Sequence, residues 1–135
     1  MRYALATLGS LALAAALGVV ALGAGSPPAA QFTAAQASSG HTTYLIQCSG
    51  CHGADLAGVY GPALAGAGSN IPYLPPSFVY DYTSVYMPAG NAGALKEQEY
   101  VNVVAYLMQQ NGRRASGTAL TVKAAQNDQT PMAPR

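Results

Sequence analysis

Charge is scarce in this chain of 135 residues, in which Asp, Glu, Lys and Arg together make up 8%. Six basic and five acidic residues give a net charge of +1, and the basic residues form no patch. Binding of nucleic acid needs such a patch, because contacts to the phosphate backbone supply most of the affinity. The composition therefore gives no support to a nucleic-acid-binding function.

Strand signals are also absent, and no internal repeat is visible. Three segments have a helical pattern instead: residues 38–47 with serine N-caps, residues 78–86 with Ser77 as cap, and residues 96–110. In the last of these, apolar residues recur at i, i+3, i+4 and i+7, and Asn111-Gly112 supplies a stop signal. The sequence predicts a small all-α domain.

The amino terminus has the pattern of an export signal. A basic start is followed by residues 4–24, which carry no charge and are rich in Ala and Leu. Ala35-Gln36-Ala37 has the small-residue pattern of a cleavage site, so the mature chain would begin at Ser38. The apolar stretch is also long enough to remain as an uncleaved membrane anchor. Its Ala, Gly and Thr content favours cleavage, and export to the periplasm is expected in either case.

Cysteine occurs only twice, as Cys48 and Cys51, and His52 follows at once. This C-x-x-C-H spacing is the attachment signature of a c-type haem. Each thiol can form a thioether with one vinyl group of the porphyrin, which leaves His52 beneath the iron as the proximal ligand. The motif predicts one covalently bound haem c. Because this haem is attached outside the bacterial inner membrane, the motif and the export signal agree on the compartment.

The rest of the chain divides around this motif. Residues 53–76 hold five glycines and four prolines, a composition typical of irregular backbone, and a haem would give so long a loop something to wrap. From residue 113 onward the sequence is polar and contains Pro131 and Pro134. We therefore expect a signal and linker over 1–37, the domain over 38–112, and an extended tail over 113–135.

The other contacts to the haem iron are less tightly specified. A ligating His52 carries a proton on its second ring nitrogen, and the carbonyl of Pro62 is a candidate acceptor, although Pro62 also reads as loop punctuation. Candidates for the sixth ligand are Met87, Met108, Met132 and His41. Met87 is favoured, because it lies on a loop just past a helix, far enough from the motif to reach the opposite face of the haem.

Tyrosines gather in residues 73–86, beside Met87. Their rings can pack on a porphyrin and their hydroxyls can reach a propionate, so Tyr82 is expected to contact the cofactor. Ordinary core packing is the competing interpretation for each of these tyrosines.

These residues together resemble the class I monohaem cytochromes c. The resemblance covers about residues 44–112 and rests on the haem motif with Tyr44 and Gly53, then Gly61-Pro62-x-Leu64-x-Gly66, Met87-Pro88, Glu99-Tyr100 and Ala105-Tyr106-Leu107. It implies three or more helices wrapped around one haem, a crossing of the first and last helices at Tyr106, and a hydrogen bond from the proximal histidine to Pro62. The segment from Tyr80 to Gly90 and the run from Asn111 to Leu120 are similar to periplasmic cytochromes, or cytochrome domains, that serve quinoprotein and related dehydrogenases, although Arg113-Arg114 departs from that pattern.

The resulting hypothesis is a periplasmic electron carrier and not an enzyme, either free or as a subunit of a dehydrogenase complex. It would pass single electrons from a dehydrogenase to a terminal oxidase or another cytochrome. A five-coordinate haem enzyme, or a gas or redox sensor, is the alternative if Met87 does not ligate. A thiol–disulfide protein that uses Cys48 and Cys51 is a third interpretation, but the βαβ pattern of such proteins is missing.

Overall fold

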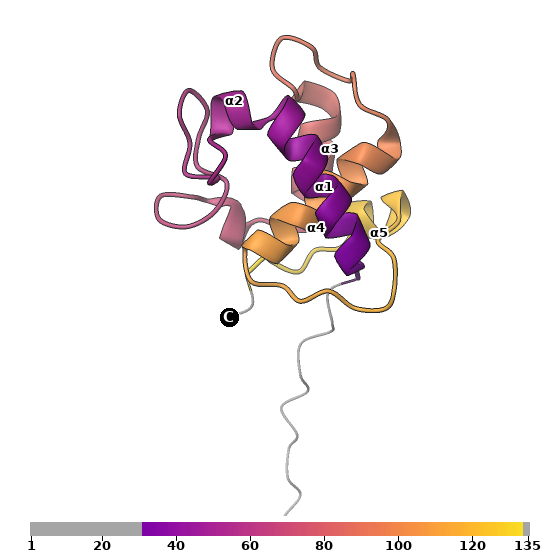
Figure 1. Ribbon diagram of the computed structural model, residues 1–135. Helices are drawn as coiled ribbons and strands as arrows, with labels where there is room; N and C mark the ends of the chain where they lie inside the picture. Colours follow the sequence, from indigo (N-terminus) through magenta and orange to yellow (C-terminus); the bar gives the residue numbers. More distant parts are fainter. Residues whose placement is uncertain (1–30, 134–135) are drawn as a thin grey trace, which may run out of the picture.

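The computed structural model describes residues 31–133 of the chain. Over these residues the fold is entirely helical and contains no strand, so the predicted all-α class is confirmed for them. The elements, shown in Figure 1, are α1 (Ala34–Gln47), α2 (Ser49–His52), the 3-10 helix η1 (Ile71–Tyr73), α3 (Pro76–Tyr86), α4 (Glu97–Gln110) and α5 (Val122–Asn127). Long irregular segments join α2 to η1 and α3 to α4, as the glycines and prolines predicted.

The core forms where α1 crosses α4 (Figure 1). Gly40 of α1 permits a very close approach, since a Cβ atom there would lie 1.8 Å from the carbonyl oxygen of Asn102 in α4. Beside this contact the rings of Tyr44 and Tyr106 lie 5.4 Å apart, centroid to centroid, and both side chains are buried. Tyr106 therefore occupies the helix crossing, as the resemblance implied.

The folded unit starts earlier than the predicted boundary at Ser38. The helix α1 begins with a capping box, in which the amide of Gln36 donates to the hydroxyl of Thr33 and the Gln36 side chain accepts from the Thr33 amide. Phe32, just before this cap, is fully buried. A cut after Ala37 would remove the cap and this buried ring, so the prediction placed the start of the domain too late.

The predicted signal or anchor segment, residues 4–24, lies outside the described residues. Between residues 31 and 133, no helix combines the length and the apolar character that crossing a membrane requires.

The predicted extended tail is wrong, because residues 113–133 fold back onto the helices. The hydroxyl of Thr121 caps α5 by accepting from the amide of Ala124. Leu120, Ala125 and Met132 are buried in the common core. Because these apolar residues are widely and irregularly spaced, they form no helical or strand period. No sequence pattern therefore indicated that they enter the core.

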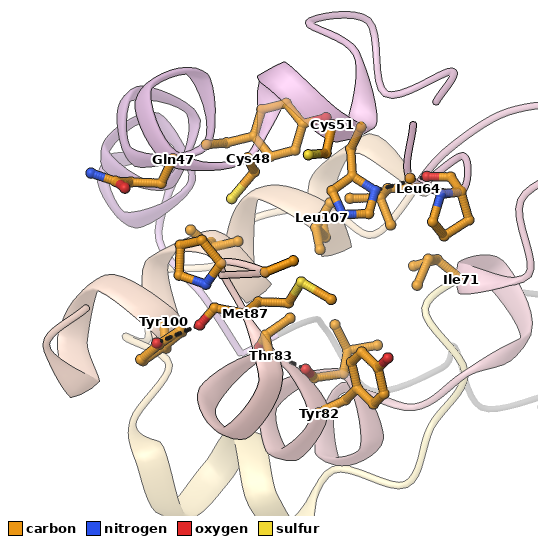
Figure 2. A pocket seen from close by; sticks show the side chains of 18 of the residues that line it. Gln47, Cys48, Cys51, Leu64, Ile71, Tyr82, Thr83, Met87, Tyr100 and Leu107 are labelled. Carbon is orange, nitrogen blue, oxygen red and sulfur yellow. Dashed lines mark hydrogen bonds between the residues drawn. The ribbon is translucent and has the colours of Figure 1, made fainter. Parts of the chain in front are cut away.

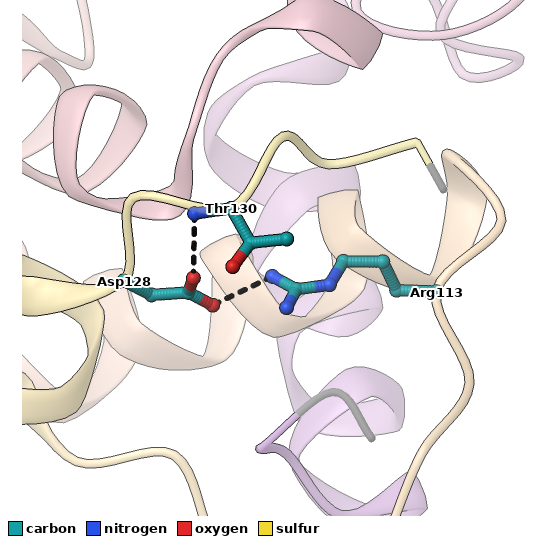
Figure 3. A network of polar contacts seen from close by, with 3 residues as sticks. All are labelled: Arg113, Asp128 and Thr130. Atoms are coloured by element: carbon teal, nitrogen blue, oxygen red, sulfur yellow. Dashed lines mark hydrogen bonds and ion pairs between the residues drawn. The ribbon is translucent and has the colours of Figure 1, made fainter. Parts of the chain in front are cut away.

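An ion pair anchors this carboxy-terminal segment (Figure 3). The guanidinium of Arg113 lies 2.7 Å from a carboxylate oxygen of Asp128, and both side chains are largely buried. The other carboxylate oxygen accepts from the amide of Thr130 at 2.9 Å. The backbone carbonyl of Asp128 accepts from the amide of Ser77 in the first turn of α3. Asp128 thus connects the end of α4 to the start of α3.

Candidate functional site

An apolar cavity of about 390 Å³ lies between α2, α3 and α4. Figure 2 shows its walls: Cys48 and Cys51 stand on one side, and the Met87 thioether reaches in from the opposite side. Leu64, Ile71 and Leu107 are among the residues that close the remaining sides. No lining residue is Asp, Glu, Lys or Arg. The cavity therefore suits a large, flat, apolar ligand.

The short helix α2 presents the C-x-x-C-H motif to this cavity. Cys48 ends α1 and begins α2, and its carbonyl accepts the amides of both Cys51 and His52. Burial raises the pKa of the Cys48 thiol to about 11, with a smaller contribution from Cys51. A thiol–disulfide centre needs a thiolate with a lowered pKa, so this environment disfavours that interpretation.

His52 is held by the loop that follows it. Its Nδ1 lies 2.8 Å from the carbonyl oxygen of Pro62, which can only accept, so Nδ1 carries the proton. In the neutral ring, which is the form that ligates a metal, this tautomer leaves the lone pair on the other ring nitrogen, Nε2. The backbone of Gly61 packs against the ring, where a Cβ would come within 2.7 Å of His52 Cε1. The predicted contact between His52 and Pro62 is therefore present in the structure.

The loop itself is tied to α2 by backbone hydrogen bonds. The carbonyl of Cys51 lies within 3.0 Å of the amides of Val59, Tyr60 and Gly61. In addition, the hydroxyl of Tyr44 donates to the carbonyl of Gly53 at 2.5 Å. These bonds hold the backbone on both sides of His52.

Met87 comes directly after α3, and its backbone is bonded on both sides. Its amide donates to the carbonyl of Thr83 at 3.0 Å, and its carbonyl accepts from the hydroxyl of Tyr100 at 2.7 Å. Figure 2 shows the second bond and the thioether extending into the cavity. Sequence reasoning did not single out Tyr100 for this contact, because the apolar period of α4 explains Tyr100 as an ordinary core residue.

The other candidates for the sixth ligand lie elsewhere. Met108 and Met132 are fully buried in the core and do not line the cavity. His41 is exposed and its ring packs at a tilt of 30° against that of Tyr106, with ring centroids 4.9 Å apart. Among the described candidates, Met87 alone lines the cavity.

Tyr82 lines the same cavity and is 45% exposed. Its ring belongs to an aromatic row along α3, with the Phe78 ring at 6.1 Å and the Tyr86 ring at 5.0 Å, centroid to centroid. Because Tyr82 both lines the cavity and is partly exposed, its side chain stands at the mouth of the cavity and not in the protein core.

These residues fit a haem c. The cavity offers an apolar surface for the macrocycle, an imidazole Nε2 with a free lone pair, a thioether on the opposite wall and two free thiols. That set of donors is the one that a low-spin c-type haem uses.

Comparison with known proteins agrees with this site. A search of curated protein sequences gave no match. The fold is similar to a chain in the crystal structure of the sulfane dehydrogenase SoxCD from Paracoccus pantotrophus, with a TM-score of 0.59 and 22% identity, covering 82% of this chain and 68% of that one. The family model for cytochrome c oxidase, cbb3-type, subunit III matches residues 35–107, more than half of the chain. The chain therefore belongs to that family and is a class I cytochrome c.

Proposed function

We propose that this protein is a periplasmic single-electron carrier with one haem c held between His52 and Met87. The observation that carries the proposal is the convergence of Cys48, Cys51, His52 and Met87 on one apolar cavity, with the thioether opposite the cysteines. When bound, the haem supplies an iron that cycles between ferrous and ferric. Cys48 and Cys51 would hold it through thioether bonds, and Nε2 of His52 would bind its iron.

The protein's own residues favour a carrier over a catalyst. The carbonyl of Pro62 keeps the His52 imidazole in the tautomer that can bind iron. Met87 lies where the sulfur can close the opposite side, so no coordination position stays open for a substrate or a gas. The five-coordinate enzyme or sensor needs Met87 to stay unbound, whereas the Met87 amide and carbonyl are both hydrogen-bonded and the side chain lines the cavity.

The proposed donor is a periplasmic dehydrogenase, and the proposed acceptor is a terminal oxidase or another cytochrome. The similarity to a chain of the sulfane dehydrogenase SoxCD supports a dehydrogenase as the donor, since that chain comes from a dehydrogenase crystal structure. The description of the matching family as an oxidase subunit supports the second. Periplasmic location rests on the amino-terminal export pattern together with the haem motif.

Covalent attachment is tested directly on a denaturing gel. The protein, expressed with a haem-attachment system, is expected to keep a haem-stained band after boiling in detergent, because thioether bonds survive unfolding. The double variant Cys48→Ser, Cys51→Ser is expected to lose this band completely. Met108→Leu, which changes a buried residue outside the cavity, serves as the control and should stain normally. A band that persists in the double variant would contradict the attachment.

Docking to the electron donor is expected to depend weakly on salt. No Asp, Glu, Lys or Arg is among the described residues that line the cavity, and the whole chain has a net charge of +1. Electrostatic steering is therefore small, and the rate of reduction by the dehydrogenase should change less than about threefold between roughly 20 and 200 mM salt. Stopped-flow reduction measures this rate. A steep fall with added salt would show that charged contacts dominate docking.

A further inference from the structure

The loop between α3 and α4, which carries Met87 at its start, has few contacts of its own. Residues 89–94 are all exposed. Gly90 and Gly93 adopt positive φ angles of 86° and 75°, in the region that favours glycine. Within the loop, the amide of Asn91 donates to the carbonyl of Pro88, and that of Gly93 makes a longer bond of 3.4 Å to the carbonyl of Met87. The loop alone provides little that would fix the Met87 side chain.

One side chain from α4 ties both ends of this loop. The hydroxyl of Tyr100 donates to the carbonyl of Met87 at 2.7 Å, and at 3.5 Å it lies at the limit of hydrogen-bonding distance from the amide of Leu95. Tyr100 is only 4% exposed, so its ring is fixed by core packing. Among residues 31–133, no other side chain is recorded in a hydrogen bond to the backbone of residues 87–95. The loop therefore closes onto a rigid point of α4.

We propose that Tyr100 is a positioning residue that holds the Met87 thioether in the cavity. The last turn of α3 fixes the Met87 amide through Thr83, and Tyr100 fixes its carbonyl. With the peptide groups on both sides of its Cα held, the direction of the Cα–Cβ bond is set, and the thioether points into the cavity. Without the hydroxyl, that carbonyl keeps only the longer bond from Gly93, and the loop opens more often.

Competition with imidazole tests this role, which rests on the proposed ligation by Met87. Imidazole can replace the thioether only when the loop opens, so its affinity for the ferric protein reports how firmly Met87 is held. Tyr100→Phe keeps the packed ring and removes the hydroxyl alone. We expect imidazole to bind this variant roughly tenfold more tightly than it binds the wild type, since one buried hydrogen bond is worth about that factor.

Tyr106→Phe is the matched control. It also removes the hydroxyl of a tyrosine buried in α4, but Tyr106 does not line the cavity. The imidazole affinity of Tyr106→Phe should therefore stay within about twofold of the wild type. Unchanged imidazole binding in Tyr100→Phe, or an equal gain in Tyr106→Phe, would overturn the positioning role.

The ferric absorption spectrum separates this failure from a failure of the proposed function. A thioether bonded to ferric iron gives a weak red band at about 700 nm. If the wild type lacks this band, Met87 is not a ligand, and both proposals fall. If the wild type has it and Tyr100→Phe binds imidazole like the wild type, only the role of Tyr100 falls.

Discussion

Replacing Met87 by alanine is expected to abolish the weak red band at about 700 nm in the ferric protein, because that band requires a thioether–iron bond. A neutral thioether also favours the reduced metal, so the reduction potential should fall by on the order of 0.2 V, within the roughly 0.8 V that axial ligands span. Absorption spectroscopy and a potentiometric titration measure the two effects.

Met108→Leu is the control for this experiment. Met108 is fully buried in α4 and does not line the cavity, and leucine nearly conserves its volume. The control should retain both the red band and the wild-type potential. Retention of the band in Met87→Ala would assign the sixth position to another residue, and a band already missing in the wild type would favour the five-coordinate enzyme or sensor.

A second large effect is expected from Gly40→Ala, which acts on the fold and not on the cavity. A Cβ atom at this position would lie 1.8 Å from the carbonyl oxygen of Asn102 and 2.4 Å from its carbon. Both atoms belong to the backbone of α4, so neither can rotate away and the helices must separate. We expect a loss of about 3 kcal/mol or more in the free energy of unfolding. For a domain of this size that corresponds to a melting temperature lower by on the order of 15 °C.

Gly117→Ala provides the comparison, because the same methyl group there meets nothing within 4 Å. Its melting temperature should stay within about 2 °C of the wild type, as is usual for a surface substitution. Thermal unfolding followed by far-ultraviolet circular dichroism, which reports helix content, compares the two variants. Equal stability of Gly40→Ala and the wild type would show that α1 and α4 do not approach as closely as the structure indicates.

The parts of this protein that could be read from its sequence are those whose signal is local. The haem motif occupies five consecutive positions, so its spacing alone identifies it. The helix α4 has an apolar period and a stop at Asn111-Gly112, and it ends there, with Gly112 at a φ of 96°. Its predicted extent, 96–110, differs by one residue from Glu97–Gln110. Signals of this kind need no knowledge of the rest of the fold.

Features that depend on distant partners were missed or misplaced. The start of α1 was set at a serine cap, although Thr33 and Gln36 have the spacing of a capping box. The predicted cleavage site after Ala37 placed both residues outside the mature chain, so their capping-box spacing was not interpreted as a helix start. The proposed role of Tyr100 depends on the carbonyl of Met87, which lies 13 residues earlier and just past the end of α3. A tyrosine in an apolar period looks the same whether or not its hydroxyl has such a partner.

The reciprocal pairing of Gln36 with Leu120 has a consequence for the timing of folding. The Gln36 side chain donates to the Leu120 carbonyl and accepts from the Leu120 amide, each at 2.8 Å, across 84 positions of sequence. Contacts between positions so far apart in the sequence form late in folding. The first helix therefore cannot complete its contacts until the segment around Leu120 is in place. Under the function proposed above, the thiols of Cys48 and Cys51 would stay accessible for haem attachment during that interval.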